Sequence, residues 1–278
     1  MDSNGSITEK LVGSIELLPP MPSNILKIRR AVSDPNMNYT HLVPILKEDP
    51  SICADLLRIA NSARYGIGHN VDTVDEAVRY FGMHSLVDFI SAACSEKIVK
   101  QYFSSIGNLN EYLRHSRQIS FAVSFICKML KLSAHDQEVL SVTSLLHDIG
   151  RLVITLVTNK QHYSRELFGV SWEDIHKFVL DENELYGIDH AILGMKICSK
   201  WQFPDKITRG VRRHHTPLLE NDFCFEGFII FLAELIAVEN LPDNVLMKTV
   251  PDEIMRKFGI DNSLLIETRS KYHQALLS

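Results

Sequence analysis

A histidine and an aspartate stand side by side within an apolar, helix-patterned stretch, Ser144-Leu145-Leu146-His147-Asp148-Ile149-Gly150-Arg151. Burying this pair is costly unless it finds a partner, and a metal ion is a partner that both groups can share. Apolar residues recur at helical spacing on one side of the stretch, while His147 and Asp148 flank the other side. We therefore predict a helix over about 136–157 that is covered on both sides and lies at the centre of the fold.

Composition limits the classes of protein to which the chain can belong. Its 278 residues suffice for one large or two small domains, and 45% hydrophobic with 23% charged residues is ordinary for a globular protein. The net charge of -5 provides no basic surface for coating nucleic acid or a membrane. The polar N-terminus and the short longest apolar run, 228–238, predict neither a signal peptide nor a membrane span. Scattered cysteines without Cys-x-x-Cys spacing are typical of a reducing compartment, so we expect a cytoplasmic protein.

Helical periodicity dominates the chain, and few segments alternate as strands do, so we predict an all-α fold. A polar turn around Gly107 is the best internal boundary. It divides the chain into an N-terminal helical lobe, 1–108, and a second helical lobe with a helical tail, 109–278. The helices expected after the turn cover about 111–132, 136–157, 171–180, 190–201, 205–215, 227–238 and 252–258.

In the N-terminal lobe, one helix is predicted to begin near Asp49 and to end at Tyr65-Gly66. Thr73 and Glu76 form a capping box that opens the next helix. That helix is expected to stop at Gly82, with another helix over 85–100.

Two helices separated by a glycine turn also fit a DNA-binding helix-turn-helix. The second helix, however, carries only Lys97 and Lys100 as bases and is also acidic at Asp88 and Glu96. Neutralising DNA phosphates needs more positive charge than this. A plain helical hairpin is the better interpretation, and we expect no nucleic-acid partner.

Further histidines and one glutamate fall on predicted inward faces of other helices. Any one of these histidines has an ordinary explanation as a hydrogen-bonded core residue, and the glutamate has one as the partner of a lysine or arginine. Their number favours a metal site, and mixed imidazole and carboxylate ligands suit Fe, Mn, Zn or Ni better than a closed structural zinc site. The candidate metal ligands are His115, His147, Asp148, His190, His214, His215 and Glu234.

The order of these residues resembles the HD superfamily of metal-dependent phosphohydrolases. More closely, the chain resembles the HDOD family, the HD-related output domain of bacterial signalling proteins. The resemblance covers about 18–240, and its second half includes the His147-Asp148 segment. The stretches that carry it are Leu18-Pro19-Pro20-Met21-Pro22, Glu48-Asp49-Pro50, 57–63, 75–82, 145–152, 189–194, Trp201-Gln202-Phe203-Pro204 and His214-His215-Thr216-Pro217.

The resemblance implies an HD-like multi-helix core preceded by an N-terminal helical lobe. It implies that His115, His147 and Asp148 match the primary metal site, with Glu234 where an aspartate is usual. It also implies that His190, His214 and His215 match the second-metal histidines of the related HD-GYP phosphodiesterases. Arg151 stands where those enzymes often have a lysine next to the phosphate.

Two departures from those enzymes bear on activity. Thr-Pro-Leu-Leu-Glu follows His214-His215, in place of the Glu and Gly-Tyr-Pro signature, so the loop that reads cyclic-di-GMP is missing. Glu234 is one methylene longer than the usual aspartate, so it either still coordinates the ion or shifts it.

Two functions remain open at this point. The leading one is a stand-alone regulatory protein with a metal-binding HD-like lobe, whose N-terminal lobe offers a surface to a protein partner in a signalling pathway. We recognise no receiver or sensor domain in the chain, so its input is expected to come from another protein. The rival is a metal-dependent phosphohydrolase acting on a nucleotide or phosphodiester, with Asp148 as the catalytic bridge between two ions and Arg151 as the substrate-binding cation.

Overall fold

The structure is a computed structural model that describes residues 3–32, 34, 36–61, 71–107, 109–158, 172–219, 222–239, 241–250 and 252–277. The described chain is helical apart from a short antiparallel pair, β1 (Leu218–Leu219) and β2 (Asp222–Phe223), in which Leu218 lies opposite Phe223. The predicted all-α fold is therefore confirmed.

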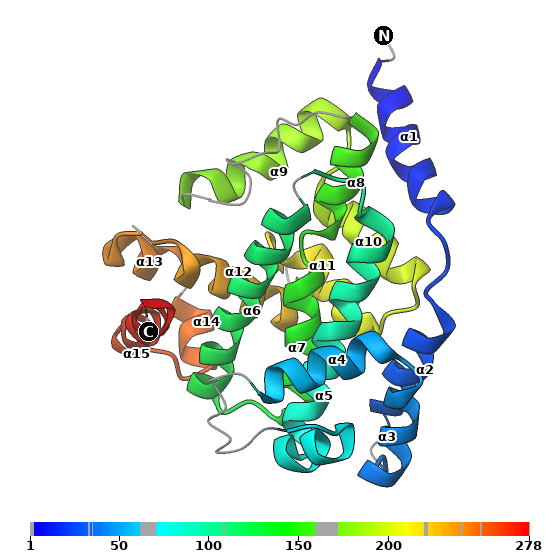
Figure 1. Cartoon of the computed structure of the whole chain (residues 1–278). Helices are drawn as coiled ribbons and strands as arrows, with labels where there is room; N and C mark the ends of the chain where they lie inside the picture. Colours follow the sequence, from blue (N-terminus) through cyan, green and yellow to red (C-terminus); the bar gives the residue numbers. More distant parts are fainter. Residues whose placement is uncertain are drawn as a thin grey trace. The chain divides into compact units, whose positions relative to one another are not determined.

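The described residues form two compact units, each with most of its contacts within itself (Figure 1). One unit, Pro19–Tyr102, contains α2 (Ser23–Val32), α3 (Tyr39–Lys47), α4 (Pro50–Ala60) and most of α5 (Val74–Phe103). The other unit joins Met1–Leu18 to Phe103–Ser278. Its helices are α1 (Ser3–Leu17), α6 (Leu109–Leu130), α7 (Ala134–Leu146), α8 (Ile149–Thr158), α9 (Trp172–Tyr186), α10 (His190–Lys200), α11 (Asp205–Arg213), α12 (Phe225–Ala237), α13 (Asp243–Thr249), α14 (Asp252–Lys257) and α15 (Asn262–Leu277).

This division differs from the expected boundary between 108 and 109, because α1 belongs to the second unit. Leu11 and Ile15 are buried, and α1 packs against α8, α9 and α10. The Thr8 hydroxyl donates a hydrogen bond to the carbonyl of Tyr186, at the end of α9. The apolar face of α1 is therefore buried by helices that lie far along the chain.

The helix break expected at Gly82 is absent, because α5 runs without interruption from Val74 to Phe103. Its start is as predicted: the Glu76 N–H donates to Thr73 Oγ1 at 3.2 Å. A glycine within a helix costs only about 1 kcal/mol, too little to end a helix stabilised by packing. Without a turn at Gly82 there is no helix-turn-helix here. The predicted helix end at Tyr65-Gly66 lies outside the described residues.

The helix predicted over 136–157 is split in two by a turn at His147 and Asp148. The Arg151 N–H donates to the Asp148 carbonyl at 2.9 Å, which closes this turn. Coverage on both sides is as expected, because every residue from Val142 to Ile154 is buried.

Among the described residues, His135–Thr158 is the segment long and apolar enough to cross a membrane, by length and composition only. Its most apolar window is 83% buried inside the protein, which is typical of core helices.

Helices α7 and α8 meet at the turn of His147 and Asp148, and both pack against other helices of the second unit. Helix α7 packs against α6, α11 and α12, and α8 packs against α10. The approach of α8 to α10 depends on Gly150, where a Cβ would overlap the His190 carbonyl and lie 2.8 Å from the Gly194 nitrogen. This close approach brings the beginning of α10 next to the turn between α7 and α8.

A separate apolar cluster joins α12 to α6 and to the C-terminal helices. Leu246 of α13, and Leu265 and Tyr272 of α15, are fully or almost fully buried in it. The cluster holds α12 in place, and α12 carries Glu234.

Candidate metal centre

Three histidines in the centre of the second unit have their Nδ1 atom engaged by an acceptor. His147 Nδ1 donates to the Ser144 carbonyl and His214 Nδ1 to the Val211 carbonyl, each at 2.7 Å. His190 Nδ1 donates to Glu182 Oε2 at 2.6 Å. In the neutral ring, a protonated Nδ1 leaves the lone pair on Nε2. Each of these side chains therefore offers Nε2 as a ligand atom.

The first ligand group consists of His115, His147 and Asp148, whose ligand atoms all lie within 4.8 Å of one another. The Nε2 atoms of His115 and His147 are 3.2 Å apart. Asp148 Oδ2 is 3.6 Å from the first of these nitrogens and 3.5 Å from the second. Helix α6 and the turn between α7 and α8 supply this group.

The second ligand group consists of Asp148, His190, His214 and His215. Asp148 Oδ1 lies 3.1 Å from His190 Nε2 and 3.7 Å from His214 Nε2. His190 Nε2 lies 3.3 Å from His214 Nε2 and 2.9 Å from His215 Nε2. All four residues are buried. They come from the turn before α8, the start of α10 and the end of α11.

Asp148 belongs to both groups, with Oδ2 facing the first and Oδ1 facing the second. Within the described chain, neither oxygen accepts a hydrogen bond of regular geometry, although the residue is only 1% exposed. The Nε2 atoms of His190 and His214 are 3.3 Å apart. At this distance a proton or a cation must lie between them if both carry lone pairs. These features fit a pair of divalent cations, so the predicted metal ligands suit the group that the sequence implied.

Glu234 lies at the edge of both groups but belongs to neither of the tight clusters. Its Oε1 is 3.5 Å from His147 Nε2, and its Oε2 is 3.9 Å from His215 Nδ1. The alternative in which a lysine or arginine neutralises it has no support among the described ion pairs, where its neighbours are these histidines.

Arg151 lies on the first turn of α8, and its Nε is 3.1 Å from Asp148 Oδ1. Only 3% of its side chain is exposed. Its cation thus neutralises part of the Asp148 charge, and a role in binding phosphate remains a prediction.

The family model of the HDOD domain matches residues 18–217 of this chain. The chain belongs to the HDOD family. The matched range includes both ligand groups, whereas Glu234 lies beyond it.

Other proteins resemble this HDOD chain over most of its length. An uncharacterized protein of Treponema pallidum (strain Nichols) is 24% identical over 216 residues, which are 75% of this chain and 40% of that protein. The chain thus spans less than half the length of this relative.

Solved structures share the HDOD fold. An HDOD domain protein with unknown function from Geobacter sulfurreducens aligns with a TM-score of 0.71 at 19% identity, over 97% of each chain. A protein of Shewanella amazonensis SB2B, provisionally named a phosphohydrolase, gives 0.69 at 23% identity, over 95% of this chain and 94% of that one. A provisionally named signal transduction protein of Marinobacter aquaeolei VT8 gives 0.73 at 18% identity, over 98% of this chain and 64% of that one.

Burial and neighbouring charges shift the pKa values of the candidate ligands in this HDOD site in different directions. Burial and the neighbouring His147 lower the pKa of His115 to about 4, and burial holds the pKa of His215 well below its ordinary value. Burial alone would lower the pKa of His190, but Glu182 outweighs it and raises that pKa to about 9. Burial alone would raise the pKa of Asp148, but Arg151 and His147 hold it well below its ordinary value. Neutral rings and an ionised carboxylate are the forms that bind metal ions, so His115, His215 and Asp148 favour the binding form, whereas His190 must release a proton to bind an ion.

Glu182 is a site residue that the sequence analysis missed. The predicted helix ended near Leu180, whereas α9 continues to Tyr186 and carries Glu182 at 2% exposure. Extending the helical pattern past Leu180 would have placed this carboxylate on the helix that precedes His190.

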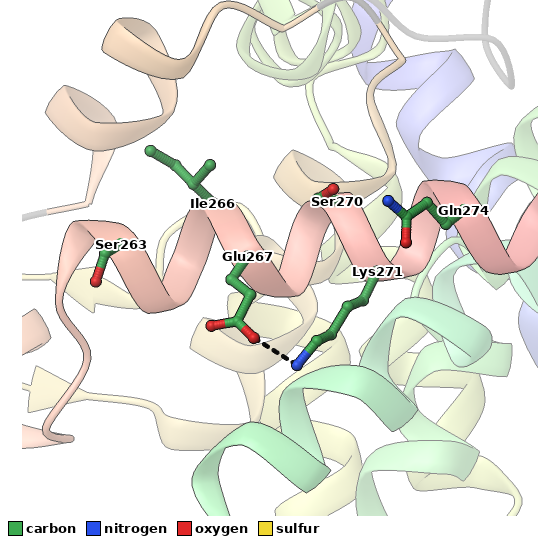
Figure 2. A pocket seen from close by; sticks show the side chains of 6 residues that line it. All are labelled: Ser263, Ile266, Glu267, Ser270, Lys271 and Gln274. Carbon is green, nitrogen blue, oxygen red and sulfur yellow. Dashed lines mark ion pairs between the residues drawn. The ribbon is translucent and has the colours of Figure 1, made fainter.

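A shallow hollow along α15, far from these ligands in the sequence, carries no comparable chemistry. Figure 2 shows Ile266, two serines and Gln274 beside the ion pair of Glu267 and Lys271. The charged atoms of this pair are 2.6 Å apart. These side chains belong to a single helix face, and none of them is a histidine or a cysteine.

Proposed function

We propose that the protein is a regulatory HDOD protein of bacterial signal transduction, whose HD-like unit binds divalent metal ions. The observation that carries the proposal is the position of Asp148, whose two oxygens face two different groups of histidines. The metal is Fe, Mn, Zn or Ni, because imidazole and carboxylate ligands suit these ions.

Each residue has a defined part in this proposal. His115 and His147 would hold one ion and His190, His214 and His215 the other, and Asp148 would contribute to both groups. Ions bound there would supply Lewis acidity and positive charge at Asp148. Arg151 limits the negative charge of the shared carboxylate, and the backbone carbonyls of Ser144 and Val211 keep two of the rings in a fixed orientation.

The enclosure of the site supports regulation over turnover. The residues of both ligand groups are at most 8% exposed, and the Arg151 side chain is engaged with Asp148. The chain after His215 is held by Arg213, whose Nε donates to the Thr216 carbonyl at 2.8 Å. A substrate needs an open path to the ligands, and the described residues offer little exposed surface there.

A signalling function requires a protein partner, and the unit over Pro19–Tyr102 is our proposed surface for it. The likeness to a provisionally named signal transduction protein is in keeping with this proposal. It is tested by pull-down with the full chain and with the Tyr80→Ala variant, because Tyr80 is a half-exposed aromatic residue of α5. Equal recovery of every bound protein by both forms would count against a partner surface that includes Tyr80.

A metal-dependent phosphohydrolase acting on a nucleotide or phosphodiester is the second candidate. A specific observation favours it, since the Arg151 cation lies beside the shared carboxylate, where it could stabilise charge on a phosphate. A similar structure is also provisionally named a phosphohydrolase.

Metal analysis of protein purified without chelator tests the proposed function. We expect about two equivalents in the parent protein and a loss of metal in His147→Ala and Asp148→Ala. His135→Ala is the matched control, because His135-Asp136 repeats the dipeptide at an exposed helix start. Parent protein that contains no metal after purification under reducing conditions, and takes up none, would refute the proposal.

Activity assays then separate the two candidates. The metal-loaded protein is incubated with a panel of nucleotides and linear and cyclic dinucleotides, and released phosphate and products are measured. Regulation predicts no turnover above the Asp148→Ala background. Turnover that disappears in both Asp148→Ala and Arg151→Ala would establish the phosphohydrolase instead.

A further inference from the structure

Glu182 contacts His190 in a way that no other ligand histidine is contacted in the described chain. Its Oε2 accepts the ring Nδ1–H of His190 at 2.6 Å and also the backbone N–H of the same residue at 2.7 Å. One oxygen atom therefore fixes both the ring and the backbone of this histidine.

The helical position of each histidine explains why His190 needs a carboxylate. His147 and His214 follow the ends of α7 and α11, so each reaches a carbonyl three residues earlier, Ser144 or Val211. His190 is the first residue of α10, with Asp189 as its N-cap, and no helical turn precedes it. The acceptor must then come from another element, and α9 supplies it.

The burial of Glu182 indicates a purpose beyond stabilising the fold. The residue is 2% exposed, and within the described protein Oε1 has no hydrogen-bond partner. A buried carboxylate with one unsatisfied oxygen is destabilising unless a nearby charge compensates it. Without an ion, the protonated His190 ring can provide that charge; when the ring is neutral, a divalent cation bound at its Nε2 would provide it instead.

We propose that Glu182 is the positioning residue of the second ligand group, holding His190 Nε2 toward Asp148 and strengthening it as a metal ligand. Hydrogen bonding of a ligand histidine to a carboxylate fixes its tautomer and raises its basicity. The metal centre then extends to α9, whose last carbonyl is in turn held by Thr8 of α1. This inference rests on the proposed metal binding.

The test compares Glu182→Ala and Glu182→Gln with Glu184→Gln, an exposed glutamate on the same helix. Zn²⁺ and Mn²⁺ are titrated against a competing chelator dye, and thermal unfolding is followed on the same samples. We expect the second ion to bind about 10–100-fold more weakly in Glu182→Ala, with the first ion unchanged. Glu182→Gln, which keeps an acceptor oxygen without the charge, should fall between Glu182→Ala and the parent. Glu184→Gln should bind like the parent.

Each outcome separates this inference from the proposed function. Parent protein that binds two ions, with Glu182→Ala binding them equally well, overturns the role of Glu182 alone. Equal weakening of both ions together with a lower Tm in both Glu182 variants assigns the residue to the fold, and that result also overturns it. Parent protein that binds no ion overturns the metal function and this inference with it.

Discussion

The two units each bury an aspartate, and the surroundings of the two carboxylates differ. Asp49, in the unit over Pro19–Tyr102, is 2% exposed and is surrounded by donors. Lys97 Nζ lies 2.6 and 2.5 Å from its two oxygens, and Asn24, Ser51 and the N–H of Ile52 donate as well. Asp148 is 1% exposed and faces imidazole nitrogens.

The contrast separates a structural carboxylate from a ligand carboxylate. Asp49 has its charge and lone pairs satisfied by the protein, so it needs nothing further. Asp148 has one permanent cation beside it, Arg151, and otherwise faces imidazole nitrogens that can bind either a proton or a metal ion. Burial alone does not distinguish them; the donors around each oxygen do.

The largest expected effect tests this contrast directly. Asp148→Asn should lose both metal equivalents, whereas Asp49→Asn should lose neither, as measured by mass spectrometry of the metal content. Addition of EDTA should lower the Tm of the parent and leave that of Asp148→Asn unchanged. An ion present at about 100 times its Kd contributes about 2.7 kcal/mol to the free energy of unfolding. Unaltered metal content in Asp148→Asn would contradict the distinction between Asp49 as a structural carboxylate and Asp148 as a metal ligand.

Asp49→Ala should reduce the free energy of unfolding by about 3 kcal/mol, because it leaves Lys97 without its partner and removes the cap of α4. Urea unfolding measures this effect. Asp55→Ala is the control on the same helix, since its pair with Arg58 is exposed and should change the stability by less than about 0.5 kcal/mol. Equal effects of the two substitutions would contradict the structural role of Asp49.

Gly150→Ala should destabilise the second unit by about 2 kcal/mol, because the added Cβ overlaps the His190 carbonyl. It should also weaken metal binding, because α10 must move away from Asp148. Gly13→Ala, in open space on α1, should instead be neutral or stabilising by up to about 1 kcal/mol. Thermal unfolding and metal titration of both variants give the comparison.

The smallest effect is a pH dependence at Asp49. Burial alone would raise the pKa of this carboxyl, but the hydrogen bonds from Lys97 and Ser51 outweigh it and lower the pKa below 3.8. The charged form is therefore favoured in the folded state, and its stabilisation is present above pH 3.8 and is lost as the pH falls through the lowered pKa. Urea unfolding between about pH 5 and 2 should show a smaller loss for Asp49→Asn than for the parent.

The clustering of the candidate ligand residues could be predicted because the signal is local: polar groups on otherwise apolar helix faces. His147 and Asp148 stood out in this way, and the structure brings His115, His190, His214 and His215 to them. Glu182 could not be found by that rule, because it follows polar neighbours near a helix end. Its importance depends on the contact between the end of α9 and the start of α10, where Glu182 meets His190.

The missed fold features depend on long-range packing in the same way. Leu11 and Ile15 give α1 an apolar face, but its partners lie more than a hundred residues away, so the sequence offered no reason to group α1 with them. The low helix propensity of glycine predicts a helix end at Gly82. Helix α5 nevertheless continues through this residue, because differences in propensity are small compared with packing energy.

The spread of the ligands along the chain has a consequence for folding. His115, His147, His190 and His215 are separated by long stretches of chain, and bringing these residues together in the unfolded chain costs entropy before any ion can be chelated. If the proposed metal binding holds, an ion would bind after the helices have assembled, and it would then cross-link segments that no disulfide joins among the described cysteines. Contacts formed after the folding transition state slow unfolding more than they speed folding. Metal loss is thus expected to shorten the lifetime of the folded unit while leaving its folding rate almost unchanged.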